Sequence, residues 1–202
     1  MSNEYKYVDG QFIYIDPKTG LLRNILGIED EETLLFVESG AVTKRLQELY
    51  EQPIRIRGVV DLFSIHQHLF QDVYEWAGKK RVVEMSKDGK QFFPIENFDT
   101  ALVYIDSLID SHRVLSTNKI EDLAILLADI LDNVNYLHPF REGNGRVQRE
   151  FLRLLALEKD LVLNLNPIND STVYDRYMTG TVNSDLNELK DLIFELISNE
   201  KE

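Results

Sequence analysis

Apolar residues return every three or four positions over much of this chain, which is the spacing of helices with one buried face. In the stretch 121–137 the apolar positions are Leu123, Leu126, Leu127, Ile130, Leu131, Val134 and Leu137. The same pattern marks the other stretches for which we predict helices: 30–50, 61–76, 96–115, 145–159 and 185–198. We therefore predict a mostly α-helical bundle.

One segment, 81–93, departs from the helical period. Two short β-prone runs flank Asp88-Gly89 in this segment. An Asp-Gly pair is typical of the tight turn between two antiparallel strands. The sequence therefore predicts a single β-hairpin within the bundle.

The length and composition are those of an ordinary globular protein. The chain has 202 residues, of which 44% are hydrophobic and 28% charged, a balance that excludes a disordered chain. We expect a single domain over 1–202, with a core at about 55–195 and an N-terminal extension at 1–54. There is no cysteine, which excludes disulfides and thiolate metal sites.

Membranes and nucleic acids are not expected partners. Residues 1–7 are polar and charged, without the apolar core of a secretion signal. No apolar run approaches the roughly 20 residues of a membrane span. The net charge of −13 repels phosphate backbones and so argues against nucleic acid. Any phosphate ligand needs a local pocket in which arginines are concentrated.

The run after the helix at 121–137 has the features of such a pocket. His138 should end this helix, because Pro139 disfavours the α conformation of the residue before it. Backbone amides just before the next helix can converge on an anion, and the residues placed there are Gly143, Asn144 and Gly145. On that next helix, three arginines share one face: Arg146, Arg149 and Arg153.

Two more side chains add chemistry to this loop. The carboxylate of Glu142, together with phosphate oxygens, can hold Mg²⁺. The imidazole of His138 can accept a proton at neutral pH. The residues alone support two interpretations, a phosphate site with a general base or a glycine-rich turn whose arginines form surface ion pairs. P-loop, dinucleotide-binding and nucleophile-elbow motifs are absent.

The run from His138 to Arg149 resembles the signature of the Fic family, His-x-Phe-x-Asp/Glu-Gly-Asn-Gly-Arg-x-x-Arg, and all eight fixed positions match. A pattern of this length with so many constraints is highly specific. Residues 69–78 and the hairpin at 81–93 also resemble the helix and the flap that precede the motif in these enzymes. The resemblance therefore covers most of 5–195 and implies a Fic-type helical bundle with one β-hairpin flap.

Fic enzymes mostly transfer AMP from ATP to a Ser, Thr or Tyr hydroxyl of a target protein, with release of diphosphate. The resemblance implies that His138 takes the hydroxyl proton, that Glu142 holds the Mg²⁺ and that Phe140 anchors the loop in the core. It further implies that the phosphates are bound by Gly143, Asn144, Gly145, Arg146 and Arg149.

The flap, residues 81–93, is expected to dock the target protein. A hairpin with a free edge can pair with an extended segment and align its hydroxyl with the α-phosphate. Our candidates for the docking strand and nucleotide lid are Met85, Ser86 and Lys87. Tyr177 is expected either to flank the adenine or to pack in the core.

Fic enzymes are commonly restrained by an inhibitory helix, Ser/Thr-x-x-x-Glu-Gly/Asn, whose glutamate engages the second motif arginine. The nearest matches begin at Thr117 and Ser184, and both depart from the pattern at its last position. We therefore expect Arg149 to have no partner in this chain, and inhibition to come from a separate small antitoxin protein. The alternatives are use as the enzymatic domain of a translocated effector, or a C-terminal inhibitory helix around Ser184.

Three functions stay open on sequence alone. They are protein adenylyl transfer, transfer of UMP, GMP or phosphocholine from another nucleotide by the same fold, and a non-catalytic protein-binding module. The intact His138, Glu142 and Arg149 argue against the last. The resemblance implies a bacterial cytoplasmic protein or one delivered into a host cell by a secretion system, and it allows a homodimer.

Overall fold

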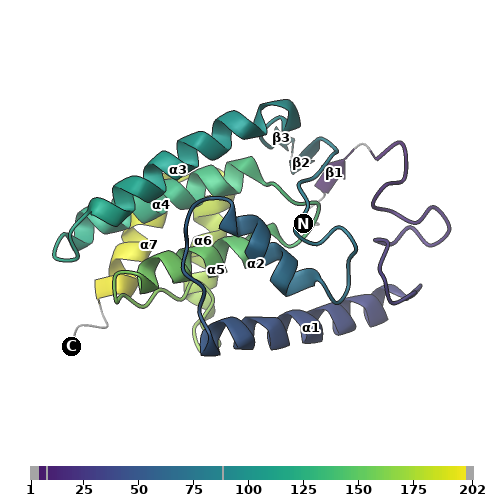
Figure 1. The fold of residues 1–202 in the computed structure, drawn as a ribbon, viewed down its shortest axis with the longest axis horizontal. Coiled ribbons are helices and arrows are strands. Elements are labelled where there is room, and N and C mark those ends of the chain that lie inside the picture. The colour runs from purple at the N-terminus through teal and green to yellow at the C-terminus, as the bar shows by residue number, and fades with distance from the viewer. Residues whose placement is uncertain (1–4, 8, 88, 199–202) are drawn as a thin grey trace.

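The computed structural model describes residues 5–7, 9–87 and 89–198, and this part of the chain is mostly helical (Figure 1). The helices are α1 (Glu31–Glu51), α2 (Asp61–Phe70), α3 (Phe98–Val114), α4 (Ile120–Leu137), α5 (Asn144–Leu157), α6 (Ser171–Asn183) and α7 (Leu186–Ser198). The remaining elements are the 3-10 helix η1 (Ile95–Asn97) and the strands β1 (Tyr5–Tyr7), β2 (Met85–Lys87) and β3 (Lys90–Gln91). The prediction of a mostly helical bundle with a β-hairpin is confirmed.

Helix α4 is the centre of the bundle and packs against α3, α5 and α7. Most of its apolar face is fully buried between Leu123 and Leu137, and Leu126 is partly buried. In Figure 1, α3 runs alongside α4, α2 lies between α5 and α1, and α6 and α7 lie behind. Each buried leucine-sized side chain contributes about 1.5–3 kcal/mol. This packing therefore fixes the position of the C-terminal end of α4, where the signature loop begins.

Two helices differ from the sequence prediction. Helix α2 ends at Phe70, and turns follow it to Gly78, whose amide donates a hydrogen bond to Nδ1 of His66 (2.8 Å). Helix α6 was not predicted, because its threonines and Gly180 have low helix propensity. Its buried residues nevertheless follow helical spacing: Val173, Tyr177, Gly180 and Thr181. Asp170 caps its N-terminus by accepting from the amide of Thr172 (3.0 Å).

The expected hairpin belongs to a sheet with the order β1-β2-β3, and all pairs are antiparallel. The N-terminal strand β1 was not predicted. It pairs residue by residue with β2, with Tyr5 opposite Lys87 and Tyr7 opposite Met85. On its other side β2 pairs with β3. The strand β2 is therefore the central strand of the sheet.

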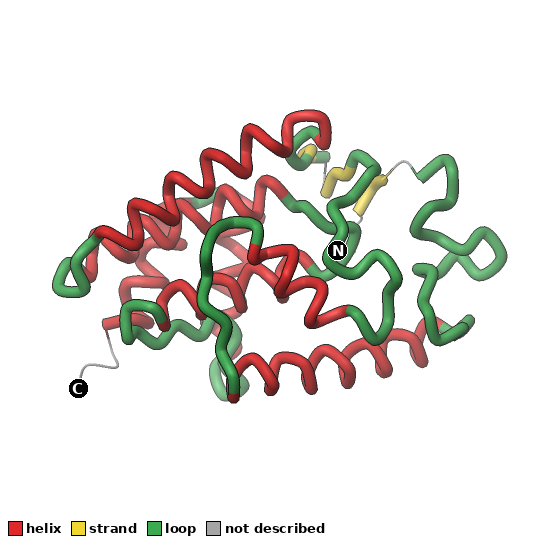
Figure 2. The backbone as a smooth tube through the Cα atoms, viewed as in Figure 1, coloured by secondary structure: helices red, strands yellow, loops and turns green. Residues whose placement is uncertain are grey.

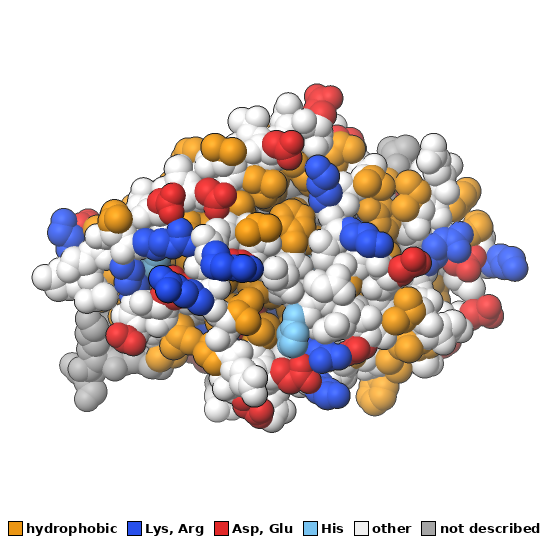
Figure 3. Space-filling view, viewed as in Figure 1, with side chains coloured by type: hydrophobic (Ala, Val, Ile, Leu, Met, Phe, Trp, Pro, Cys, Tyr) orange, Lys and Arg blue, Asp and Glu red, His pale blue; other side chains and the backbone are white. Residues whose placement is uncertain are grey.

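The sheet lies at one end of the helical layers, close to the C-terminal end of α4 (Figure 2). A hydrogen bond from the amide of Phe93 to the carbonyl of Tyr136 (2.9 Å) fixes the flap to that end of α4. On the face shown in Figure 3, acidic and basic side chains are interspersed. Within the described residues, no helix is long and apolar enough to cross a membrane.

Candidate active site

The signature loop joins α4 to α5 and begins at His138. The amide of His138 still donates to the carbonyl of Val134 (3.1 Å), while its backbone turns into the left-handed region with φ 43°. This conformation costs a residue other than glycine about 1 kcal/mol or more. The helix therefore ends at Leu137, as Pro139 predicted, and His138 is held where the chain changes direction.

Asn144 closes the loop on itself. Its Oδ1 accepts from the amide of Phe140 (3.0 Å), and its Nδ2 donates to the carbonyl of the same residue (2.8 Å). Phe140 is fully buried, as expected of an anchor, and stacks on His66 with ring centroids 3.9 Å apart. Both side-chain groups of Asn144 are engaged within the loop, so its contribution to a phosphate site is its backbone amide.

Gly143 requires the absence of a side chain. Its φ is +81°, and a Cβ atom there would lie 2.3 Å from the ring of Phe70. Its amide donates to Oε1 of Glu142 (2.8 Å). The amides that follow Gly143 lie in the first turn of α5, where no helical carbonyl can accept a hydrogen bond from them. They belong to Asn144, Gly145 and Arg146.

His66 of α2 holds the signature loop in place by a hydrogen bond, a role that was not predicted from the sequence. Its Nδ1 accepts from the amide of Gly78, so Nε2 carries the proton and donates to the carbonyl of Glu142 (3.1 Å). Burial lowers the pKa of His66 to about 3. The imidazole therefore stays neutral and fixes the backbone beside the candidate metal ligand.

The three arginines of α5 point in different directions. Arg146 binds Oε1 of Glu38 on α1 (Nη1 to Oε1, 2.5 Å) and lies 3.5 Å from Glu142. Arg149 lies over the rings of Tyr174 and Tyr177, with its guanidinium carbon 5.3 Å from each centroid. Arg153 does not join the site, because its guanidinium binds Glu150 (2.7 Å), the carbonyl of Leu49 and the face of Tyr50. The expectation of three guanidinium groups beside the loop is therefore corrected to two.

Glu38 is the other residue that the sequence did not reveal. It is buried, and besides Arg146 it accepts a hydrogen bond from the hydroxyl of Tyr74. Burial and the nearby carboxylate raise the pKa of Tyr74, so its hydroxyl keeps its proton. Arg146 is thus shared between a buried carboxylate and Glu142. No local motif around residue 38 could indicate a partner 108 positions away.

A pocket of about 440 Å³ lies between the flap, the end of α4, α5 and α6. The expected site residues that line it are Lys87, His138, Gly145, Arg149 and Tyr177. The expected site residues that do not line it are Met85, Ser86, Glu142, Gly143, Asn144 and Arg146. Met85 is instead buried in the core. Tyr177 is both a core residue and part of the pocket wall, and its hydroxyl donates to Oε1 of Gln148 (3.2 Å).

His138 borders this pocket but is covered from solvent. It is 6% exposed, and Phe92 of the flap stacks on it with centroids 3.7 Å apart. Its Nδ1 lies 3.3 Å from the carbonyl of Asn135, so Nδ1 carries the proton and Nε2 is in its basic form. Burial, with smaller contributions from Arg81 and Lys87, lowers the pKa of His138 to about 3. Negative phosphates in the pocket would oppose the effect of these cations.

The flap differs from the expectation of a free docking edge at Met85, Ser86 and Lys87. These residues form β2, which has β1 on one side and β3 on the other. The strand that fills the expected docking position comes from residues 5–7. The pairing of β1 with β2 was not predicted, because β1 is short and lies far from residues 85–87 in the sequence. In this structure a further strand cannot add to β2.

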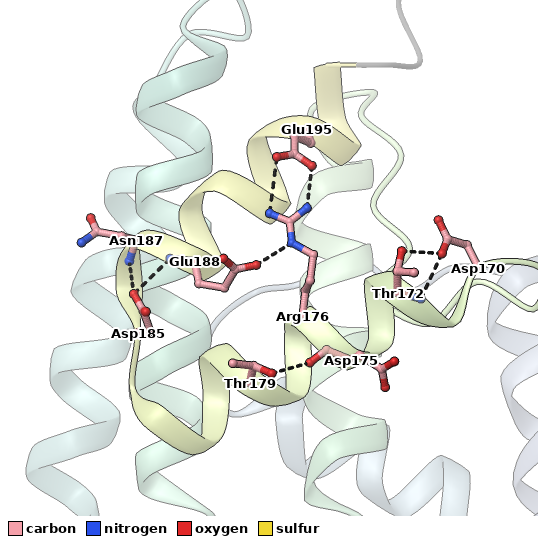
Figure 4. Close-up of polar contacts among 9 residues, drawn as sticks. All are labelled: Asp170, Thr172, Asp175, Arg176, Thr179, Asp185, Asn187, Glu188 and Glu195. Atoms are coloured by element: carbon pink, nitrogen blue, oxygen red, sulfur yellow. Dashed lines mark hydrogen bonds and ion pairs between the residues drawn. The ribbon is translucent and has the colours of Figure 1, made fainter.

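The candidate inhibitory glutamates are Glu121, in the match that begins at Thr117, and Glu188, in the match that begins at Ser184. Neither of them reaches Arg149. Glu188 binds Arg176 of α6 (2.5 Å), and Glu195 binds the same guanidinium (2.6 Å), as Figure 4 shows. Glu121 lies in the first turn of α4, roughly 25 Å along the helix from His138. Within the described residues, no carboxylate lies within 4.0 Å of the guanidinium nitrogens of Arg149.

Known proteins share this sequence pattern. The profile of the Fic/DOC family matches residues 58–156. Probable protein adenylyltransferase y4lH of Sinorhizobium fredii is 32% identical over 158 residues, which cover 75% of this chain and 78% of the relative. Protein adenylyltransferase VbhT of Bartonella schoenbuchensis is 37% identical over 154 residues, 76% of this chain. The chain spans only about a third (32%) of that relative's length. Probable protein adenylyltransferase Fic of Salmonella typhimurium is 27% identical over 98% of both chains.

Solved structures share the fold. The N-terminal Fic domain of an effector protein from Bartonella sp. AR 15-3 superposes with a TM-score of 0.83 at 23% identity, covering 94% of this chain and 93% of that one. BepC of Bartonella tribocorum, solved with bound AMPPNP, gives a TM-score of 0.79 at 21% identity, with 92% and 96% covered. The family profile includes the whole loop from His138 to Arg149, and the relative from S. fredii is matched over most of both chains. The chain therefore belongs to the Fic/DOC family.

Proposed function

We propose that this protein is a protein adenylyltransferase that moves AMP from ATP to a Ser, Thr or Tyr hydroxyl of a target protein. The supporting observation is that His138 and Arg149 border one pocket, with Gly145 at the start of α5 between them. A base, an anion-binding helix terminus and a guanidinium group are what transfer from a nucleoside triphosphate requires.

In the proposed reaction the target hydroxyl oxygen forms a bond to the α-phosphorus of ATP. The bond from that phosphorus to the bridging oxygen breaks, and diphosphate leaves. Nε2 of His138 takes the hydroxyl proton, because Nδ1 already carries one and faces the carbonyl of Asn135. The buried, neutral imidazole is in the form that can accept a proton over the physiological pH range.

The phosphates would lie against the first turn of α5. Its amides at Asn144, Gly145 and Arg146 point out of the helix end, and Arg149 faces the pocket. The nucleoside would occupy the pocket, which has Tyr177 in its wall. Hydrogen bonds and guanidinium groups of this kind neutralise the charge that develops on the leaving diphosphate.

Glu142 suits the role of a Mg²⁺ ligand. One carboxylate oxygen is held by the amide of Gly143, and the side chain is 40% exposed, so the second oxygen can face solvent and phosphate. Mg²⁺ commonly takes one or two carboxylates and completes its shell with phosphate oxygens and water. When bound, it would supply charge neutralisation between the phosphates.

The target is proposed to dock on the flap at 81–93. In the described part of the sheet, β2 is paired on both sides, so β3 carries the open edge on the hairpin. Lys90 and Gln91 of β3 are exposed and border the same pocket as His138. An extended target segment along this edge would bring its hydroxyl toward the imidazole.

We also infer that inhibition comes from outside this chain. An inhibitor would need to place a carboxylate on Arg149, which the described carboxylates do not reach. A separate small antitoxin protein fits this requirement. The relatives reported above are bacterial, and we propose a bacterial cytoplasmic location or delivery into a host cell by a secretion system.

The test is to incubate the protein with Mg²⁺, α-labelled ATP and a cell lysate. We expect label on a protein band with the wild type, and at least a hundredfold less with H138A, while ATP binding is retained. H68A is the matched control, because His68 is paired with Glu48 on the surface of α2, outside the pocket. Transfer of label from UTP, GTP or CDP-choline but not from ATP would overturn the choice of nucleotide. ATP binding without transfer would leave only a binding module.

A further inference from the structure

Arg81 stands at the base of the flap and is 1% exposed, so its cationic side chain is buried. Its Nε donates to the carbonyl of His138 (2.8 Å). Its Nη1 and Nη2 donate to the carbonyls of Val83 (2.7 Å) and Phe93 (2.6 Å). Its own amide donates to the carbonyl of Pro139 (2.7 Å). One residue therefore holds both ends of the flap and the first two residues of the signature loop.

The acceptors of Arg81 are unusual for a buried cation. Three are backbone carbonyls, and the one carboxylate, Glu84, lies 3.4 Å from Nη1 and is 55% exposed. Burial lowers the pKa of Arg81. A buried charge is expensive to retain, and a well-packed apolar residue of similar volume is often neutral or stabilising. General stability is therefore a weak reason for an arginine at this position.

The contact with His138 is specific to the backbone conformation of that residue. The left-handed backbone conformation (φ 43°, ψ 60°) determines where the carbonyl of His138 points, and Nε of Arg81 binds that carbonyl. A strained residue keeps such a conformation only when its surroundings enforce it. The planar fork of arginine can bind three carbonyls at fixed angles, which the single ammonium group of lysine cannot do.

The same guanidinium group also fixes the distance between the flap and the imidazole of His138. Val83 and Phe93 lie on either side of the hairpin, and Phe92 between them stacks on His138. Arg81 therefore fixes the position of Phe92, which covers the imidazole, relative to His138 itself. It does not itself line the pocket.

We propose that Arg81 is a positioning residue for the transfer reaction, acting through the backbone of His138 and the two ends of the flap. This inference rests on the proposed function of His138. We expect a loss in the chemical step with nucleotide affinity retained, because the hydrogen bonds found for Arg81 go to the flap and to His138 and Pro139, and not to the first turn of α5 or to Arg149.

The test compares R81K with R153K. Arg153 is the matched control, since it is a largely buried arginine (12% exposed) with several hydrogen bonds, and it lies outside the site. We expect R81K to lower kcat at least tenfold and to change the Kd of an ATP analogue less than twofold. R153K is expected to lower stability with kcat unchanged. R81Q, which keeps two donors on a neutral side chain, is the second variant.

A readout independent of activity is the NMR spectrum of histidine-labelled, ligand-free protein. R81K and R81Q are expected to shift the ring signals of His138 and to leave those of His112 unchanged. This measurement stands even if no transfer is detected, so failure of the proposed function and failure of this inference are distinguishable. The inference is overturned if R81K keeps both kcat and the His138 signals. It is equally overturned if both Arg81 variants are unfolded while R153K is folded, because Arg81 is then a folding residue.

Discussion

The ring of Phe92 lies flat on the imidazole of His138, with centroids 3.7 Å apart and planes inclined by 14°. This contact explains why a residue that borders the pocket is only 6% exposed. It also links the flap to the acidity of the candidate base, because burial is the main cause that lowers the pKa of His138 to about 3.

Replacing Phe92 with alanine should therefore raise the pKa of His138 by at least one unit toward its ordinary value of about 6.5. The proposed base accepts a proton only in its neutral form. With a higher pKa it becomes protonated sooner as the pH is lowered, so the loss of activity in acid begins at a higher pH. The acid limb of the pH–rate profile should move upward, and a histidine NMR titration should show the same shift. F93A is the control, since the ring of Phe93 packs edge-on against Tyr136 instead. An unchanged pKa in F92A would show that Phe92 is not the cover.

Gly143 and Gly89 offer a matched pair for the signature loop. Both have φ +81°, but an added Cβ at 143 would meet the ring of Phe70 at 2.3 Å, whereas nothing lies within 4 Å of a Cβ at 89. G89A should cost about 1 kcal/mol for the left-handed backbone alone. G143A should cost about 2–4 kcal/mol, because overpacking adds to the same backbone strain. Urea denaturation measures both, and equal losses would contradict the close approach of Phe70.

Glu38 should affect stability and nucleotide binding in opposite directions. E38Q keeps the shape of the side chain but removes the charge that binds Arg146. We expect a loss of stability of about 1–2 kcal/mol, less than for a fully buried pair because Arg146 is 27% exposed. The freed positive charge should strengthen ATP binding by about 1 kcal/mol, or roughly fivefold in Kd.

Calorimetric titration and thermal denaturation measure the two effects of E38Q. E48Q is the control on the same helix, because Glu48 pairs with Arg45 and His68 away from the pocket. Weaker ATP binding in E38Q would show that Glu38 positions Arg146 for the nucleotide instead of competing for it.

Buried neutral histidines should make the protein sensitive to acid. Burial lowers the pKa of His66 and His138 to about 3 and that of His112 to about 4. The unfolded chain takes up these protons below about pH 6.5, while the folded protein does not until about pH 3–4. The free energy of unfolding should therefore fall as the pH drops through this window, by at most about 4 kcal/mol per pH unit if all three act together.

His112 gives a clean check of this acid effect. Neither of its ring nitrogens has a hydrogen-bond partner in the described structure, and it lies outside the pocket. H112F should reduce the slope of stability against pH by about a third and raise stability at neutral pH. Urea denaturation at several pH values measures this slope. A slope equal to that of the wild type would assign the acid effect to other groups.

The parts of the site that depend on near neighbours in sequence were predictable. Pro139 indicated the end of α4, and the two glycines indicated a turn before α5. The directions of the arginines were not predictable. Helical spacing gives Arg146, Arg149 and Arg153 similar faces, but their partners Glu38, Tyr174 and Glu150 decide where each guanidinium group points.

Longer-range pairings were also beyond sequence reasoning. Helix α6 was missed because threonine, tyrosine and glycine form its buried face in place of leucine. The roles of His66 and Arg81 depend on backbone atoms of Glu142 and His138. Such acceptors carry no sequence signal, because every residue has the same carbonyl group.

The pairing of β1 with β2 makes residues 5–7 direct neighbours of the flap. Proteolysis, truncation or an affinity tag that disturbs residues 5–7 would therefore alter the flap, where we propose that the target docks, although about eighty positions separate the two segments in sequence. A preparation cut just before residue 9 would present β2 with an open side. Preparations that differ at residues 5–7 should therefore present different surfaces of the flap to an incoming protein.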